Sequence, residues 1–227
     1  MVTPPVRTPI PGSDPKRVKL LDNVKDALRS IGAYFDSSTH IEGLEAGDLF
    51  NLNSVLGSSI EVQVVDTLNR IRKVWDPDDE WPEHKFERSS QTFPDVRLVA
   101  RTGGALSNVL GIELKGWYLL AKEGEPSFRY KVTPQVCSEF DLLVVVPWHL
   151  KNVLSGVPVV YEPYIEQARF VAEYRNYWLC AKKCAKTLQG RKGHGIEEIY
   201  NNHLTKEGSI PWLQPSIQPE HGRSHHW

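Results

Sequence analysis

The chain has few cysteines, almost no net charge and no long apolar run, and each of these excludes a class of protein. Three cysteines among 227 residues are odd in number and too few for a disulfide framework, which favours a reducing, cytoplasmic setting. A net charge of −1 provides no general attraction to nucleic acid or membrane, so DNA binding would need a local basic patch. No stretch is long enough to span a bilayer, and the first residues lack the apolar core of a signal peptide.

What the chain does contain is typical of a globular protein. Hydrophobic residues make up 40% of it and charged residues 24%, and a chain of this length can bury a real core. We expect a single domain over residues 1–227. Its predicted parts are a flexible N-terminal arm, a first helix, a core and a loosely ordered tail, over residues 1–13, 16–35, 54–188 and 206–227.

Two helices are predicted near the start of the chain. Asp14-Pro15 forms a good N-cap and first turn, and apolar residues then recur at helical spacing as far as Phe35. Residues 36–57 are broken by Ser, Gly and Asp, so we expect them to be irregular. A second helix, with a clear apolar stripe, is predicted over residues 58–75.

The stretch over residues 93–120 is the centre of the chain. It contains two short apolar runs, Val96–Ala100 and Val109–Leu120, which are rich in Val, Ile, Leu and Tyr. Two glycines, Gly103 and Gly104, lie between the runs. Apolar runs separated by such a turn-rich segment predict a β-hairpin with a longer loop.

Three charged side chains interrupt this apolar hairpin. Asp95 lies where the first strand begins, and Glu113 and Lys115 lie in the middle of the second. Because side chains alternate along a strand, Glu113 and Lys115 share a face, and strand pairing lets Asp95 lie beside Glu113. Burying two carboxylates and an ammonium group is costly unless they pair or bind a metal. The hairpin is therefore the first candidate for a functional site.

The remaining pattern predicts an α/β fold with a mixed central sheet flanked by helices. The run over residues 140–147 is apolar throughout, as in a strand that is buried on both faces. A short helix is predicted at Thr133-Pro134, and a long one over residues 164–188 after Pro163. Including the apolar run, strands outside the hairpin are predicted over residues 84–88, 128–132, 140–147 and 157–161.

Pro94-Asp95 followed by Glu113-Leu114-Lys115 resembles the signature of the PD-(D/E)XK nucleases, the restriction-endonuclease-like superfamily. Only this set falls on two predicted neighbouring strands. The resemblance implies a restriction-endonuclease-like core, while the alternative is an acid–lysine pair that is solvated on an open sheet face. Pieces of the signature without that context occur at Pro77-Asp78, Asp14-Pro15-Lys16 and Glu83-His84-Lys85.

The resemblance extends to residues 113–120, 122–126 and 174–178, which are similar to segments of bacterial type II restriction enzymes. It implies Mg²⁺-dependent hydrolysis of phosphodiester bonds in double-stranded DNA, with Mn²⁺ as a substitute for Mg²⁺. It also implies a homodimer that acts at a short palindromic site. A cognate DNA methyltransferase is expected in the same system, but not as a stable subunit.

Within this resemblance, Asp95, Glu113 and the backbone carbonyl of Leu114 are the expected metal ligands, since Mg²⁺ prefers hard oxygen donors. A bound metal would lower the pKa of its water and stabilise the developing charge. Lys115 is expected to orient that water and the phosphate, or to accept the proton of the water if its own pKa is depressed. The residues alone do not distinguish these two roles.

Glu61 is a fourth candidate catalytic residue. In the superfamily, a helix before the hairpin often supplies an extra acidic residue, and Glu61 matches by position. The segment from Ser58 to Glu61 also forms a capping box, in which Glu61 would only accept a backbone amide at the helix start. Both interpretations stay open at this point.

A basic cluster without an acidic residue extends from Arg175 to Lys192. In an otherwise neutral chain it is the candidate to contact DNA phosphates. Lysines also favour helix C-termini, where they complement the helix dipole, so a purely structural role is the alternative. The predicted DNA-binding residues are Arg175, Asn176, Lys182, Lys183, Lys186, Arg191 and Lys192.

Two other functions remain compatible with the sequence. The first is a repair or recombination nuclease on the same core, which would act on DNA structures or lesions. The second is a non-catalytic DNA-binding or assembly protein whose hairpin charges form only an ion pair. A methyltransferase gene beside this one would favour restriction, and the absence of Mg²⁺-dependent cleavage would favour the non-catalytic protein.

Overall fold

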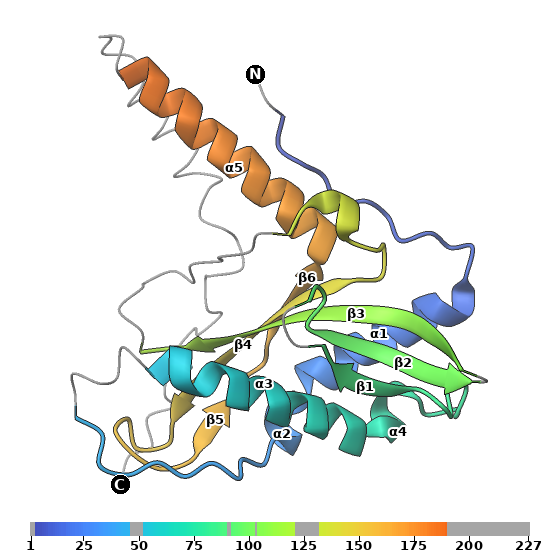
Figure 1. Ribbon diagram of the computed structural model, residues 1–227, viewed down its shortest axis with the longest axis vertical. Helices are drawn as coiled ribbons and strands as arrows, with labels where there is room; N and C mark the ends of the chain where they lie inside the picture. The colour runs from blue at the N-terminus through green and yellow to red at the C-terminus, as the bar shows by residue number, and fades with distance from the viewer. Residues whose placement is uncertain (1–2, 46–51, 90–91, 103, 121–131, 190–227) are drawn as a thin grey trace, which may run out of the picture. The chain divides into compact units, whose positions relative to one another are not determined.

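The computed structural model describes residues 3–45, 52–89, 92–102, 104–120 and 132–189 (Figure 1). The chain divides into two compact units, Met1–Trp178 and Leu179–Trp227. All strands among the described residues belong to the first unit. The predicted turn over residues 122–126, most of the predicted strand over residues 128–132 and the predicted tail over residues 206–227 lie outside the described residues.

The first predicted helix is confirmed, with one break. It consists of α1 (Pro15–Arg29) and α2 (Ile31–Tyr34), separated at Ser30. Asp14 caps α1 as predicted, since its Oδ1 accepts a hydrogen bond from the Arg17 amide at 3.0 Å. The inner face of α1 is fully buried, with Leu20, Leu21, Val24, Ala27 and Leu28.

The second predicted helix begins earlier than the sequence indicated. It comprises α3 (Leu52–Arg70) and α4 (Arg72–Trp75), so Ser58 lies inside α3 and does not cap it. The expectation of irregular structure up to residue 57 is therefore wrong for the last residues of that range. Gly57 lowers the helical propensity of this turn, but Gly57 lies against β3, and such packing overrides local propensity.

The described strands form a mixed six-stranded sheet that packs against helices, as the sequence predicted (Figure 1). The order is β1-β2-β3-β4-β5, and β6 also pairs with β4. Strands β1, β2 and β3 are antiparallel neighbours, whereas β3 and β4 are parallel. The bounds are β1 (Lys85–Arg88), β2 (Val96–Thr102), β3 (Ala105–Tyr118), β4 (Leu142–Leu150), β5 (Pro158–Val160) and β6 (Tyr164–Gln167).

The long predicted helix after Pro163 does not begin at Tyr164. Tyr164–Gln167 is strand β6, and α5 follows over Ala168–Gln189. The reason is long-range pairing, because β5 covers only the last residues of β4 and leaves the edge of its first half open. Strand β6 fills that half in antiparallel register, from Leu142↔Gln167 to Val145↔Tyr164. No local sequence pattern indicates that part of a strand edge elsewhere in the sheet is unpaired.

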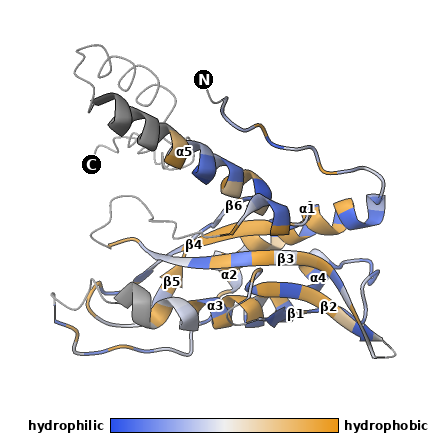
Figure 2. Cartoon of the chain, turned by 45° about the horizontal axis from the view of Figure 1, so that its top comes forward, coloured by the Kyte–Doolittle hydropathy of each residue, from blue (hydrophilic) through white to orange (hydrophobic). Residues whose placement is uncertain are grey.

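The sheet separates two apolar clusters, and Figure 2 shows the hydrophobic strands between the helices. Alternate residues of β3, such as Ile112 and Leu114, join the large cluster that contains the buried faces of α1 and α3. On β4, Leu143 and Val145 join a smaller cluster with Ala168 and other residues. No helix in the described part of the chain is long and apolar enough to cross a membrane.

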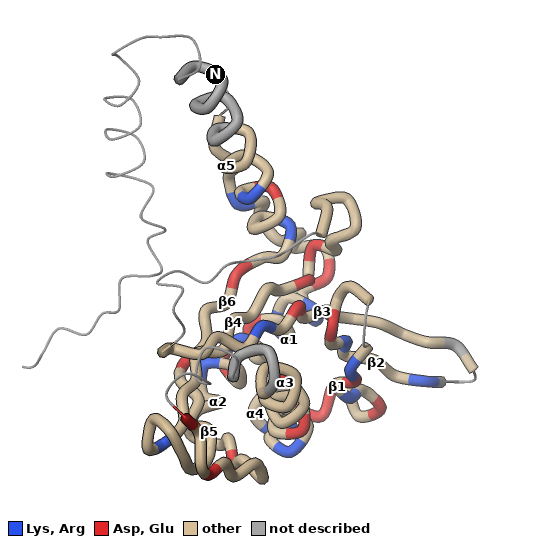
Figure 3. The backbone as a smooth tube through the Cα atoms, turned by 60° about the vertical axis from the view of Figure 1, so that its left-hand side comes forward, with Lys and Arg blue, Asp and Glu red and all other residues tan. Residues whose placement is uncertain are grey.

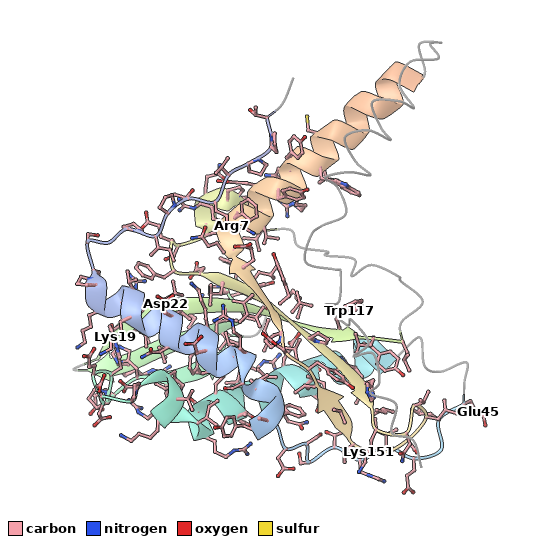
Figure 4. All side chains as sticks on the ribbon, turned by 180° about the vertical axis from the view of Figure 1, so that it is seen from behind. Arg7, Lys19, Asp22, Glu45, Trp117 and Lys151 are labelled. Atoms are coloured by element: carbon pink, nitrogen blue, oxygen red, sulfur yellow. The ribbon has the colours of Figure 1, made fainter. Side chains whose placement is uncertain are left out.

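The N-terminal arm is extended, as predicted, and it is anchored to the sheet. Arg7 forms an ion pair with Glu166 of β6 at 2.6 Å, and the Gln167 side chain donates to the Thr8 carbonyl at 3.0 Å. Figure 4 shows Arg7 where the arm passes β6 and the start of α5. The Arg7 side chain is 62% exposed and the Glu166 side chain 9% exposed, and the Arg7 guanidinium also lies over the Phe170 ring, 4.8 Å from its centroid.

Candidate active site

The site lies where β2 begins. Pairing of β2 with β3 ends at Val96↔Ile112, although β3 continues to Tyr118. Beyond Ile112, no strand of the described residues pairs with this edge of β3, while β4 pairs with its other edge. The open edge creates a notch in the sheet, and Figure 3 shows acidic and basic positions of α3, β1, β2 and β3 gathered around it.

Asp95, Glu113 and Lys115 meet at this notch, as the hairpin pattern predicted. The Lys115 ammonium lies 2.7 Å from Glu113 Oε1 and 3.1 Å from Asp95 Oδ2. The Glu113 side chain is only 9% exposed, the Asp95 side chain 24% and the Lys115 side chain 39%. Two largely buried carboxylates, Glu113 and Asp95, therefore share one cation, and that cation, Lys115, is the most exposed of the three side chains.

Glu61 also lies at the site, for a reason that the sequence did not indicate. Helix α3 packs against β3 where Gly57 meets Gly116, and a Cβ on Gly116 would lie 3.4 Å from Gly57 Cα, in ordinary van der Waals contact. The Glu61 carboxylate accepts a hydrogen bond from the backbone amide of Gly116 and pairs with Arg88 of β1 at 3.2 Å. The capping-box interpretation is wrong, because Glu61 lies in the interior of α3.

The acids of the site are crowded. Burial raises the pKa of Glu113, and the nearby Asp95 carboxylate raises it further, against the opposing effect of Lys115. Burial and Asp95 likewise raise the pKa of Glu61, which Lys115, Arg88 and the Gly116 amide only partly offset. Among these five side chains there are three acids and two bases. The cluster thus has an excess of negative charge in a partly buried place.

Lys115 is held as a cation. Burial alone would lower the pKa of Lys115, but its hydrogen bonds and ion pairs with Glu113 and Asp95 outweigh burial and raise that pKa. The depressed pKa that a proton-accepting lysine needs is therefore not what this geometry produces. In the protein without metal, Lys115 therefore acts as the cation that Glu113 and Asp95 share.

The residues at the notch fit a magnesium ion held by few protein ligands. Mg²⁺ usually keeps several waters and binds through one or two carboxylates together with substrate phosphates. Asp95 and Glu113 already converge on the Lys115 ammonium, which marks a position for positive charge. Leu114 has a buried side chain and could add only its backbone carbonyl.

In the structure the Glu61 carboxylate binds Arg88 and the Gly116 amide. The described residues contain no group of three or more His, Cys, Asp or Glu side chains that could hold a metal. Glu61, Asp95 and Glu113 therefore do not form a three-acid cage. Glu61 is turned instead toward Arg88 and Gly116.

The sequence interpretation missed the residues that support the Pro94-Asp95 turn. Asp141 is only 5% exposed and accepts a hydrogen bond from the Ser138 amide at 2.7 Å. Gly111 of β3 lies next to the Asp141 carboxylate. Two signals were present, namely a lone acid in the apolar stretch FDLLVVVP and a glycine inside a strand. For Arg88 the sequence contains no signal that we can identify.

The predicted DNA-binding residues are described only in part. Arg175 and Asn176 lie on α5, where the Arg175 guanidinium donates to Asn176 Oδ1 at 2.8 Å. The backbone of α5 includes Lys182, Lys183 and Lys186, but their side chains lie outside the described residues, as do Arg191 and Lys192. Their contact with DNA stays a prediction.

Comparison of the chain with protein-family models, with curated proteins and with solved structures found no significant match. Any functional argument therefore has to start from the geometry of the chain itself.

Proposed function

We propose that the chain is a Mg²⁺-dependent endonuclease that hydrolyses phosphodiester bonds in double-stranded DNA. By the resemblance of its hairpin motif to the PD-(D/E)XK nucleases, we assign it to the type II restriction enzymes. The single observation that carries the proposal is the meeting of Asp95, Glu113 and Lys115 at the open edge of β3. The element order α3-β1-β2-β3-β4, with an antiparallel hairpin followed by a parallel strand, supports a restriction-endonuclease-like core.

The chemistry requires that negative charge be neutralised on the phosphate under attack and that a water become nucleophilic. Bound Mg²⁺ would supply both effects, through its charge and through the lowered pKa of its water. Asp95 and Glu113 would hold the metal with carboxylate oxygens. Lys115 stays cationic between them and can bind a non-bridging phosphate oxygen, because its side chain is 39% exposed.

Glu61 and Arg88 would act around this centre rather than in it. Glu61 adds a negative charge beside Asp95, which favours a metal cation in the cluster. Arg88 pairs with Glu61 and has a side chain that is 32% exposed. Arg88 is therefore a second cation near the notch that would bind a phosphate of the DNA backbone.

The enzyme is expected to act as a homodimer. A homodimer would place two sites in two-fold symmetry, which matches a short palindromic DNA sequence. The basic residues of α5 and beyond would contact phosphates without regard to sequence. A companion methyltransferase would protect the same sites in the host.

The decisive experiment is digestion of a long, fully sequenced DNA with purified protein in Mg²⁺, followed by mapping of the ends. We expect defined fragments in Mg²⁺ and Mn²⁺ and binding without cleavage in Ca²⁺, with ends that share a short palindrome. Asp95→Asn protein, prepared in parallel, should cleave nothing and so exclude a contaminating nuclease. Absence of divalent-dependent cleavage on all DNA substrates would overturn the proposal.

A second arm of the same experiment separates restriction from repair. DNA with branches, flaps or lesions should be cut no faster than the intact duplex that carries the palindrome. Preferential cutting at structures, with random ends on intact duplex, would assign the site to a repair or recombination nuclease.

A further inference from the structure

We propose that Asp141 is a positioning residue for Asp95, which it holds through Gly111, the residue that Pro94 also lies beside. This inference rests on the proposed function, since Asp95 matters as a ligand only if the site binds metal. Asp141 itself does not touch the notch. Its carboxylate lies on the far side of the Pro94-Asp95 turn, at the end of β4 where the strand begins.

The Asp141 side chain is buried and bound to two backbone amides. One oxygen accepts from Ser138 at 2.7 Å, and the carboxylate also accepts from the amide of Gly111 on β3. The main chain of the same residue is anchored as well, because its carbonyl accepts from the Ala168 amide at 2.9 Å. Asp141 thus binds β3 and the loop before β4 through its carboxylate, and the start of α5 through its main-chain carbonyl.

Gly111 is the point where Asp141 and the catalytic turn meet. A Cβ added to Gly111 would lie 2.4 Å from Asp141 Oδ1 and 2.4 Å from Pro94 Cγ. Both groups therefore occupy the space that any other side chain would need. Along β3, Gly111 is two residues before Glu113 and on the same face, so this contact adjoins the site directly.

The carbonyls on both sides of Pro94 are also bound. The Arg97 guanidinium donates to the Phe93 carbonyl at 3.1 Å, and the Ser89 amide donates to the Asp95 carbonyl at 2.6 Å. Pro94 thus lies between two fixed carbonyls and beside Gly111, whose amide the Asp141 carboxylate binds. A shift of Pro94 would be passed directly to Asp95, the next residue in the chain.

Stability alone does not explain a carboxylate in this place. Burial raises the pKa of Asp141, although the amides of Ser138 and Gly111 and the charges of Arg17 and Arg97 oppose the shift. A buried charge is often no more stabilising than an apolar side chain of similar size. The two directed hydrogen bonds do, however, fix the orientation of Gly111 and its neighbours to a degree that apolar packing would not.

The test uses Asp141→Asn and Gly111→Ala, with Asp76→Asn as a matched control. Asp76 is also a buried aspartate that accepts two backbone amides, from Glu80 at 2.8 Å and Trp81 at 3.1 Å. An asparagine can satisfy one amide but not both, so each Asn variant loses a hydrogen bond to a backbone amide. Asp76→Asn also weakens the ion pair of Asp76 with Arg72 at 3.0 Å, so it is the more severe test of a purely structural effect. Only Asp141→Asn and Gly111→Ala should disturb Asp95.

Three readouts are measured on the full chain: the melting temperature, the Mg²⁺ concentration for half-maximal cleavage and the ¹³C carboxyl signal of Asp95 by NMR. We expect Asp141→Asn and Gly111→Ala to shift the Asp95 signal and to raise the half-maximal Mg²⁺ concentration about tenfold, as loss of a supporting partner typically does. Asp76→Asn should lower the melting temperature but leave the other two readouts unchanged.

The outcomes separate the two proposals. Wild-type protein that neither binds Mg²⁺ nor cuts DNA would overturn the proposed function, while the NMR signal would still decide whether Asp141 positions Asp95. An unchanged Asp95 signal together with an unchanged Mg²⁺ requirement in Asp141→Asn would overturn the inference. If Gly111→Ala fails to fold, Asp141→Asn decides alone, because it changes no side-chain volume.

Discussion

Two charged clusters lie on the antiparallel half of the same sheet, and their compositions are opposite. In the outer cluster one acid meets two bases, since Glu87 of β1 pairs with Arg101 at 2.6 Å and with Lys85 at 3.1 Å. In the notch cluster the acids Glu61, Asp95 and Glu113 share two bases, Lys115 and Arg88.

The two clusters shift carboxylate pKa values in opposite directions. The hydrogen bond from Arg101 lowers the pKa of Glu87 to about 2, with Lys85 adding to the effect. Burial and neighbouring acids raise the pKa values of Glu61 and Glu113. The Glu87 carboxylate is fully paired, and the outer cluster has an excess of positive charge. The notch cluster is short of positive charge, as expected for a site that receives a metal and a substrate.

The largest effect is expected from removing the charged groups of the notch. Asp95→Asn and Lys115→Ala should each lower the cleavage rate about 1,000-fold or more, because each removes several kcal/mol of charge stabilisation at about tenfold per 1.4 kcal/mol. Glu87→Gln, the matched change in the outer cluster, should cut at the wild-type rate. Single-turnover cleavage of a defined DNA measures all three variants.

Circular dichroism must show that these variants remain folded. We expect little loss of stability in Asp95→Asn, which relieves repulsion among the acids. Lys115→Ala should lower stability more, because Asp95 and the buried Glu113 lose the cation that they share. A Lys115→Ala protein that cuts at nearly the wild-type rate would show that the site is assigned wrongly.

The notch was largely predictable from the sequence, because its three central residues follow local rules. Side-chain alternation places Glu113 and Lys115 on one face, and the glycine turn brings Asp95 of the paired strand beside them. The mixed sheet was predictable for a similar reason, since the fully apolar run that became β4 requires cover on both faces.

The supporting residues were not predictable, because they depend on contacts between distant segments. Glu61 reaches the notch because α3 packs against β3, where Gly57 lies beside Gly116. Strand β6 forms only because β5 leaves half of the β4 edge unpaired. Hydrophobic periodicity reports neither an unpaired strand edge nor the packing of a helix on a distant strand. The sequence therefore predicted a helix that begins at Tyr164 and a helix cap at Ser58.

The next largest effect is stabilisation by metal, which should distinguish the clusters without any DNA. A ligand at 100 times its dissociation constant stabilises the folded state by about 2.7 kcal/mol. Saturating Mg²⁺ or Ca²⁺ should therefore raise the melting temperature of the wild type by several degrees. Glu87→Gln should show the same increase.

Glu113→Gln is the variant that should abolish this stabilisation, because a neutral amide is a much poorer Mg²⁺ ligand than a carboxylate. An equal increase in Glu113→Gln and in the wild type would place the metal elsewhere in the chain. Scanning calorimetry at matched ionic strength, with Na⁺ in place of the divalent ion, is the measurement.

A smaller effect is expected from Glu61→Gln. Glutamine keeps an oxygen that can accept the Gly116 amide, so the melting temperature should stay within about 1 °C. Loss of the Glu61 charge weakens the electrostatic attraction of the notch for a cation and removes the ion pair with Arg88. We expect cleavage to slow about tenfold and to recover in part at high Mg²⁺ or in Mn²⁺.

The matched control for this prediction is Arg101→Ala in the outer cluster, which should leave the cleavage rate unchanged. Full activity of Glu61→Gln at low Mg²⁺ would remove Glu61 from the site and leave Asp95, Glu113 and Lys115 to carry the chemistry.

The smallest effect concerns the pH dependence of the outer cluster. Because the folded pKa of Glu87 is about 2, below its usual value of 4.5, its ion pairs stabilise the protein above the unfolded pKa. That contribution is lost as the pH falls from about 4.5 toward 2. The side chains of Arg101 and Lys85 are 62% and 65% exposed, so solvent screening limits it to about 0.2–1 kcal/mol. Urea unfolding of wild type and Glu87→Gln should differ by this amount at pH 7, by less at pH 3, and converge near pH 2. If the difference in unfolding free energy between the two proteins grew in acid, the ion pairs of Glu87 would not be the source of the stabilisation.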